Sequence, residues 1–325
     1  MKARWTGFRS PMATDIQEFV TAKRAIARRY LVEEKALRIW DAFLVERGIT
    51  RVDEITPILI EQFLVTRSHR RARSYNHILG VVRRLFDWLV RQGRLSSSPV
   101  KARPRRQTAR RIPFILKPDD VRRLLELASA LPPNARAPLR AETYRTMFAL
   151  MYGLGLRVGE VCRLTFGDVD FVKKLLVVRN TKFDKSRLAP FGPKVDELLR
   201  WYISIRGAGA DDAPLFSFTK RGPVCTETVS QTFKQLIQRL DLVVPTGTAP
   251  PHLHCLRHAF AVETLLRWYR SGVDPAARLF HLATFMGHVS PSSTAVYLTI
   301  TAELLAEGDR RFHRFATPVF TEAIP

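Results

Sequence analysis

The chain has 325 residues, 46% of them hydrophobic, which is enough for two domains with separate cores, and its formal net charge at pH 7 is +23. No apolar run reaches the length of a membrane span and the N-terminal stretch lacks the apolar middle of a signal peptide, so we expect a cytoplasmic protein without a membrane partner. The three cysteines are few and widely spaced, which excludes a disulfide framework and a CxxC zinc pattern.

The positive charge is concentrated in the first third of the chain. Residues 1–111 hold 25 basic and 10 acidic residues, a net charge of +15, and the remainder holds 28 and 20, a net charge of +8. Self-repulsion on this scale destabilises a compact fold unless a polyanion offsets it. We therefore predict nucleic acid as the partner, ahead of an anionic membrane surface.

Helical spacing of apolar residues predicts a small all-α unit over residues 1–95. Gly48 and Gly93 stand where two of the helices should end, and Thr56 followed by Pro57 is typical of a helix start. The predicted helices, joined by short loops, cover 12–30, 32–48, 56–68 and 74–94.

Residues 96–111 are predicted to form a linker. Residues 94–111 contain seven basic residues, two prolines and no acid, and we expect them to make no part of a core. The segment is either a flexible spacer or a basic strap that lies along phosphates, and the two interpretations are compatible.

Residues 112–325 are predicted to be mostly helical with one small antiparallel sheet. A helix starts at Pro118, and the apolar stretch 140–155 predicts a buried helix. Two short strands, 175–178 and 187–191, flank the turn 180–186, and helices resume after it. The whole chain is thus mainly α with a small β-sheet.

The histidines near residue 254 first suggest a metal site. His254 and His258 are four residues apart, with His252 and Cys255 beside them. A zinc protease motif requires a glutamate directly after its first histidine, where Cys255 stands, and no third ligand is evident. We therefore expect no metal and no cofactor.

Six residues, His254 among them, suit one reaction, the cleavage of a phosphodiester by a tyrosine, although each alone has an ordinary structural explanation. Two guanidiniums can hold the non-bridging oxygens of the phosphorus. A phenol needs a base or nearby positive charge to act as a nucleophile, and the leaving oxygen needs a proton. No acidic cluster is present to bind Mg²⁺, so side chains must supply the positive charge. The six are Arg157, Lys182, His254, Arg257, His288 and Tyr297.

In these residues the chain resembles the tyrosine recombinase (phage integrase) family. The stretch "YGLGLRVGE" is similar to the family's first arginine box, with Arg157 and its acidic neighbour Glu160. "NTKFDKSRLAP" is similar to the β-hairpin that carries the lysine, Lys182, with Lys185 as a second candidate. "HLHCLRH" matches the H-x-x-R box, and "MGHVSPSSTAVY" matches the last box, which ends on the tyrosine.

The resemblance implies an N-terminal core-binding, SAM-like helical domain and an α+β catalytic domain over 112–325 that grip double-stranded DNA as a C-shaped clamp. Tyr297 would form a 3′-phosphotyrosyl bond, Lys182 would protonate the 5′ oxygen, and His254 would act in proton transfer. The transition state would be stabilised by Arg157, Arg257 and His288. Family members act as tetramers on two DNA sites, with partner recombinases or accessory DNA-bending proteins in some cases.

Some features depart from the family pattern. The stretch 265–288 is longer than in compact members, and its His281 is expected to be non-catalytic. "LTIT" follows Tyr297 in place of the commoner Thr-His, and no arm-binding domain is expected before residue 12. We favour a site-specific recombinase of a mobile element. The alternatives are a type IB topoisomerase-like enzyme and a non-catalytic DNA-binding relative.

Overall fold

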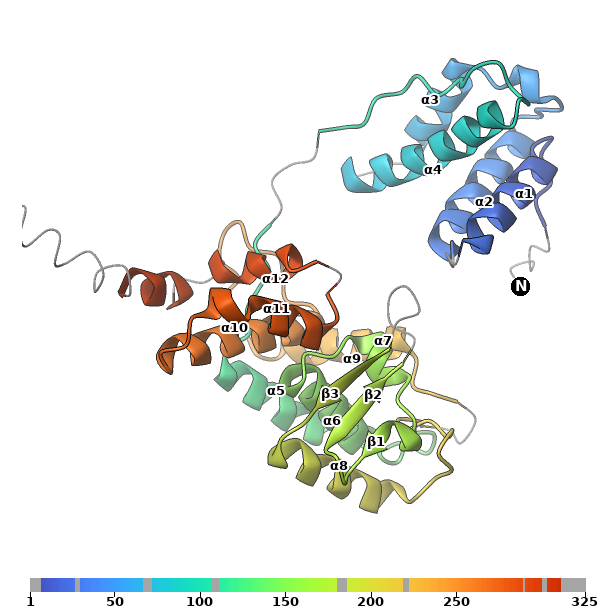
Figure 1. Ribbon diagram of the computed structural model, residues 1–325. Helices are drawn as coiled ribbons and strands as arrows, with labels where there is room; N and C mark the ends of the chain where they lie inside the picture. The colour runs from blue at the N-terminus through green and yellow to red at the C-terminus, as the bar shows by residue number, and fades with distance from the viewer. Residues whose placement is uncertain are drawn as a thin grey trace, which may run out of the picture. The chain divides into compact units, whose positions relative to one another are not determined.

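The computed structural model describes residues 7–26, 30–66, 72–106, 111–179, 186–218, 222–288, 290–299 and 303–310 (Figure 1). The chain divides into two compact units, residues 1–110 and 111–325, with separate apolar cores. In the ranges described, no helix combines the length and the apolar character needed to cross a membrane. As predicted, the structure is mainly helical with one small antiparallel sheet.

In its described residues the first unit contains helices and loops and no strand. Its helices end and begin at the predicted signals. Gly48 (φ +65°) and Gly93 (φ +71°) follow two of them in the left-handed conformation that glycine adopts without a Cβ clash. Thr56 Oγ1 accepts a hydrogen bond from the Leu59 backbone N–H at 3.3 Å, just ahead of a helix that starts at Pro57. The elements are α1 (Ala13–Ala25), α2 (Leu31–Glu46), η1 (Val52–Glu54), α3 (Pro57–Thr66) and α4 (Ala72–Arg91).

Aromatic side chains form the centre of the first core. Trp40 is fully buried, and its ring packs against those of Phe43, Phe63 and Phe86, with centroids 4.9 to 6.3 Å apart. Burying a large aromatic ring removes more apolar surface from water than burying any other type of side chain. This cluster therefore holds α2, α3 and α4 together.

Part of the segment predicted as a linker packs onto the first unit. Val100 and Ala102 are buried in its core, which differs from the expectation that 94–111 makes no part of one. Asn76 on α4 exchanges two hydrogen bonds of 2.8 Å with the backbone of Arg105. The Arg105 guanidinium also lies over the Tyr75 ring at 4.0 Å. Residues up to 106 are therefore held on α4.

The second unit combines helices with a three-stranded antiparallel sheet of order β1-β2-β3. Leu176 pairs with Ala189 in the register of β2 and β3, and both are fully buried. These two strands confirm the predicted ones, whereas β1 is too short to leave a sequence signal. The first elements of the unit are α5 (Pro118–Ser129), α6 (Arg140–Gly153), α7 (Val158–Cys162), η2 (Phe166–Asp168), β1 (Val169–Asp170), β2 (Leu175–Val178) and β3 (Arg187–Pro190).

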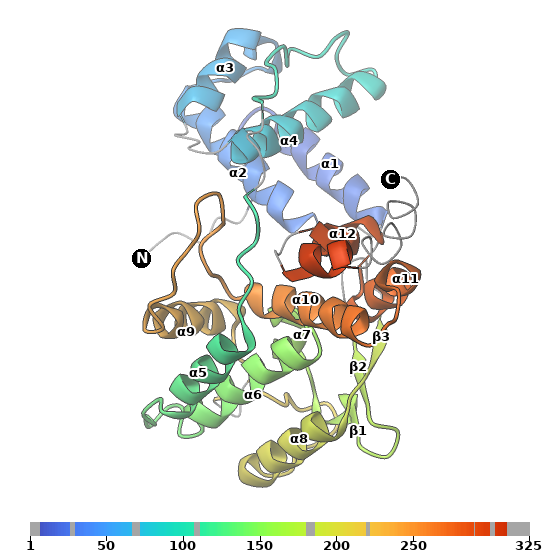
Figure 2. The ribbon, with the colours of Figure 1, turned by 90° about the vertical axis from the view of Figure 1, so that its left-hand side faces the viewer.

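Helices of the second half complete the unit. α6 lies in its interior, as the apolar sequence predicts, and α10 packs along it (Figure 2). α11 and η3 pack on α10 and form a smaller apolar cluster with it, and α12 packs on α11. The remaining elements are α8 (Pro193–Arg206), α9 (Thr226–Gln238), α10 (Cys255–Arg270), α11 (Pro275–Met286), α12 (Ser292–Ala295) and η3 (Val296–Thr299).

Candidate active site

Five of the six predicted site residues lie together in the second unit. The electrostatic surroundings of Arg257 include Arg157 and Tyr297, and those of His288 include both arginines and His254. The sixth residue, Lys182, falls on 180–185 and lies outside the described residues, as does Lys185. The predicted convergence of guanidinium, imidazole and phenol groups is therefore present in the described part of the site.

Arg157 stands at the start of α7, held by the carboxylate of Glu160. Glu160 Oε2 accepts the Arg157 backbone N–H at 2.9 Å, and Oε1 accepts Nη1 at 2.7 Å. Arg157 Nη2 donates to the Gly287 carbonyl at 2.9 Å. Glu160 is buried, whereas the Arg157 side chain remains 30% exposed. The buried carboxylate therefore fixes the guanidinium, and its solvent-exposed side can contact a ligand.

Arg257 on α10 is fully buried. Its Nη2 donates to the Met286 carbonyl at 2.7 Å, and its Nη1 donates to the Gly155 carbonyl. Burial, and then the nearby charge of Arg157, lower the pKa of Arg257 to about 9. Among the described residues its Nε has no hydrogen-bond partner, so an incoming anionic oxygen would satisfy a buried donor.

Gly155 makes the arginine contact possible. It adopts φ +59°, and a Cβ there would lie 2.5 Å from Cδ1 of Phe260. Only glycine fits this left-handed turn against the ring, and the turn presents the Gly155 carbonyl to Arg257. The glycine thus serves the site through its backbone.

His254 and His288 are uncharged at neutral pH. Burial, and then the charge of Arg257, lower the pKa of each imidazole to about 4. His288 Nδ1 lies 2.6 Å from Oγ1 of Thr294, which is fully buried on α12. Both rings can therefore donate or accept single hydrogen bonds without adding positive charge beside the arginines.

Tyr297 lies on η3 and is only 4% exposed. Its hydroxyl lies 2.6 Å from Nδ1 of His258, and the two ring centroids are 5.5 Å apart. His258 in turn meets His254 edge to face at 4.7 Å. From the sequence, His258 is only a member of the histidine cluster that was excluded as a metal site. Its position four residues from His254 on one helix face was the signal that could have placed it in the site.

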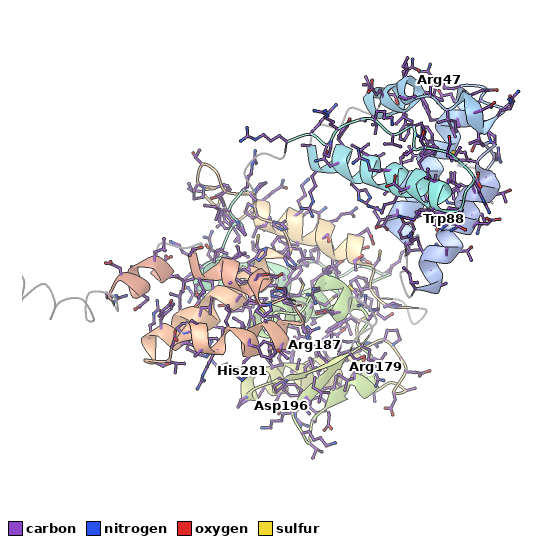
Figure 3. All side chains as sticks on the ribbon, turned by 45° about the horizontal axis from the view of Figure 1, so that its top comes forward. Arg47, Trp88, Arg179, Arg187, Asp196 and His281 are labelled. Atoms are coloured by element: carbon purple, nitrogen blue, oxygen red, sulfur yellow. The ribbon has the colours of Figure 1, made fainter. Side chains whose placement is uncertain are left out.

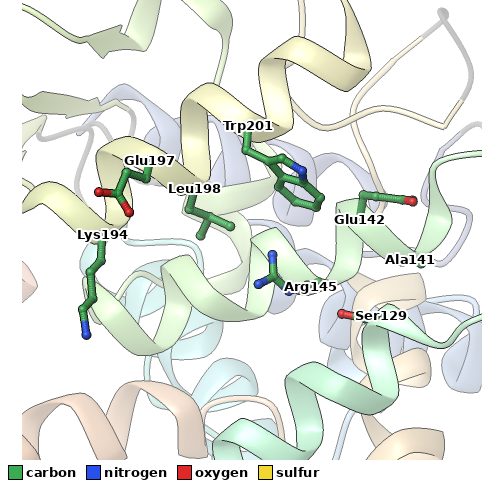
Figure 4. A pocket seen from close by; sticks show the side chains of 8 residues that line it. All are labelled: Ser129, Ala141, Glu142, Arg145, Lys194, Glu197, Leu198 and Trp201. Atoms are coloured by element: carbon green, nitrogen blue, oxygen red, sulfur yellow. The ribbon is translucent and has the colours of Figure 1, made fainter.

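Other polar features lie apart from this cluster. Among the described residues, no group of three or more His, Cys, Asp or Glu side chains is arranged to hold a metal ion. His281 is an exposed residue of α11, labelled in Figure 3. An open cavity of about 570 Å³ lies between α5, α6 and α8 (Figure 4), and none of its lining residues, Arg145 and Trp201 among them, belongs to the site.

The site lies in the part of the chain that matches a known family. The sequence model described as the phage integrase family matches residues 115–303, which contain every residue of the site. The chain belongs to the phage integrase family. It is an enzyme of the tyrosine recombinase class, whose members cleave and rejoin DNA strands.

Relatives match along most of their length. The chain is 31% identical over 308 residues to the integrase/recombinase y4rB of Sinorhizobium fredii, covering 92% of this chain and 96% of the relative. It is 29% identical over 251 residues to the tyrosine recombinase XerC of Xanthomonas axonopodis pv. citri, covering 76% and 75%.

Solved structures share the fold. A lambda integrase dimer bound to a COC′ core site has a TM-score of 0.63 at 20% identity, covering 87% of this chain and 76% of the other. The Tn1549 transposon integrase in complex with a circular intermediate DNA also has a TM-score of 0.63, at 17% identity, covering 92% and 99%.

Proposed function

We propose that the protein is a site-specific DNA recombinase of a mobile genetic element, which acts in the cytoplasm through a 3′-phosphotyrosyl intermediate. The observation that carries this proposal is the hydrogen bond between the Tyr297 hydroxyl and His258. Two arginines are part of the same site: Arg257, which is buried, and Arg157, which Glu160 holds. A phenol with a proton acceptor at 2.6 Å and positive charge nearby has what it needs to become a nucleophile.

In the cleavage step, the Tyr297 oxygen attacks the scissile phosphorus and its proton moves to His258 Nδ1. The bond from phosphorus to Tyr297 forms as the bond to the 5′ oxygen breaks, and Lys182 gives that oxygen its proton. His254, next to His258, takes part in the proton transfer. The return of a 5′ hydroxyl from a partner strand reverses these steps, so no ATP is consumed.

Charge that develops on the non-bridging oxygens is stabilised by Arg157, Arg257 and His288. Arg157 is partly exposed and Arg257 has a buried donor available, so the two can approach one phosphate from two sides. His288, which is neutral, adds a hydrogen bond rather than a charge.

The two units would divide the work on DNA. We assign the first unit, with the basic segment held on α4, to binding of the DNA core site, and the second to catalysis. A homotetramer on two DNA sites, with partner recombinases or accessory DNA-bending proteins, would exchange strands in pairs.

The test begins with cells that express the full chain with an affinity tag. Covalent protein–DNA adducts are purified under denaturing conditions and their DNA is sequenced, which identifies the target site. A nicked suicide duplex built from that site is then cleaved in vitro. We expect wild-type protein to form the adduct and Tyr297→Phe to bind the same duplex without forming it. An adduct formed by Tyr297→Phe would rule out this nucleophile.

A plasmid assay separates the recombinase from a type IB topoisomerase. Supercoiled plasmid that lacks the target site is incubated with the protein, and we expect it to stay supercoiled. Efficient relaxation of that plasmid would favour the topoisomerase.

A further inference from the structure

Three arginines converge on the C-terminal end of α11, where each donates to one of three consecutive backbone carbonyls. Carbonyls at a helix C-terminus lack partners within the helix and carry the negative end of its dipole, so they suit guanidinium groups. The pairs are Arg187 Nε with Phe285 O at 2.9 Å, Arg257 Nη2 with Met286 O at 2.7 Å, and Arg157 Nη2 with Gly287 O at 2.9 Å.

Arg187, the first residue of β3, has no role in the mechanism proposed above. Its side chain, which Figure 3 labels, is only 11% exposed. Nη1 and Nη2 donate to the two oxygens of Glu160 at 2.9 and 2.8 Å, the planar two-bond pairing that suits arginine and carboxylate. The same carboxylate holds Arg157, so Glu160 lies between two guanidiniums.

The charges explain why a second guanidinium matters. Burial alone would raise the pKa of Glu160, but hydrogen bonds and charge from Arg187, with a contribution from Arg157, lower it to about 2. With Arg157 as its only partner, the carboxylate would neutralise the guanidinium that a phosphate needs. With Arg187 present, the three groups keep one positive charge in excess.

We propose that Arg187 is a positioning residue for DNA cleavage: it neutralises Glu160 and ties it to the end of α11, which keeps Arg157 aligned and available to the scissile phosphate. The proposal rests on the function proposed above. It predicts a defect that depends on the charge of the phosphate, because Arg157 serves the charged non-bridging oxygens.

The experiment compares two suicide duplexes that differ only at the scissile position. One carries the natural phosphate, and the other carries a methylphosphonate, in which a methyl group replaces one non-bridging oxygen and removes the negative charge. Single-turnover adduct formation is measured for full-length wild type, Arg187→Gln and Arg187→Lys. Arg200→Gln is the matched control, because Arg200 also forms an arginine–carboxylate pair, with Asp196 on α8, but its own side chain is exposed. Figure 3 labels Asp196.

For Arg187→Gln we expect a loss of about 30-fold on the phosphate and about threefold or less on the methylphosphonate, with DNA affinity unchanged. Arg200→Gln should cleave both duplexes at the wild-type rate. An equal loss on both duplexes, or no loss on the phosphate, would overturn the proposal, because a general folding defect does not distinguish the two substrates.

Arg187→Lys keeps the test decisive if Arg187→Gln does not fold. Lysine retains the charge that neutralises Glu160 but makes no two-bond contact with it. We expect a loss of about tenfold on the phosphate and none on the methylphosphonate, and equal losses would overturn the proposal. Wild-type protein that forms no adduct with either duplex would instead refute the proposed function itself.

Discussion

The hydroxyl of Tyr297 lies 2.6 Å from Nδ1 of His258, a residue that the sequence motifs do not single out. The contact joins η3 to α10, and in the tautomer that carries its proton on Nε2, His258 accepts the hydrogen bond of the proposed nucleophile before DNA is bound. The tyrosine is also buried, which shields the phenol from water.

Replacing His258 by phenylalanine should slow single-turnover adduct formation by about 100-fold, the usual worth of one proton acceptor, with little change in DNA affinity. His258→Asn is the matched control, since its amide oxygen can accept the hydrogen bond but cannot take the proton at neutral pH. We expect it to keep Tyr297 in place yet cleave nearly as slowly. Wild-type rates for His258→Phe would show that the proton goes elsewhere.

Gly155→Ala should destabilise the second unit by about 3 kcal/mol, because the new Cβ meets the Phe260 ring and the backbone is left-handed. Gly272→Ala is the matched control. Gly272, in the turn that ends α10, also has positive φ, +80°, but a Cβ there meets nothing within 4 Å, so only the backbone cost of about 1 kcal/mol is expected. Denaturant unfolding measures both. Equal costs would contradict the contact with Phe260.

Stability should fall as the pH is lowered from 6.5 to 4. The folded pKa values of His254 and His288 are about 4, below the ordinary 6.5, so the unfolded state binds more protons in this window. In this pH range, each histidine lowers the free energy of unfolding by up to about 1.4 kcal/mol for each unit by which the pH falls. Urea unfolding at several pH values tests this. His288→Gln should flatten the dependence and His281→Gln should not; an unchanged slope in His288→Gln would contradict the assignment.

DNA affinity should fall by orders of magnitude between roughly 50 and 200 mM salt, since each phosphate contact releases counterions. Fluorescence anisotropy with a labelled duplex gives the slope. Asn76→Ala, which frees the backbone of Arg105 from α4, should weaken binding at every salt concentration. A flat salt response would show that the basic segment on α4 does not contact phosphates.

Much of the site could be predicted because its chemistry is carried by residues at fixed spacings. His254 and Arg257 are one helical turn apart, so their proximity follows from the helix alone. The grouping of Arg157 with Arg257 and His288 joins distant parts of the chain, and only the resemblance to a family implied it. The contact of Arg157 with the Gly287 carbonyl, 130 positions away, was not predicted.

The residues and elements that the sequence did not reveal have no recognisable local sequence pattern. Arg187 reads as an ordinary strand arginine, and only the fold brings it to Glu160 and to the Phe285 carbonyl. The packing of Val100 and Ala102 was missed because their basic neighbours dominate the composition of that segment. A two-residue strand such as β1 gives no periodicity to detect.

The three arginines hold α11 by its backbone, which has a consequence for how the gene can change. Substitution of Phe285 or Met286 leaves the carbonyl contacts available, whereas one residue inserted within Pro275–Met286 would turn the end of the helix by about 100° and displace all three carbonyls together. Insertions and deletions should therefore be tolerated in the loop before Asp274 and rejected between there and His288. The positions of the three carbonyls at the site therefore depend on the length of α11 and not on the identity of its side chains.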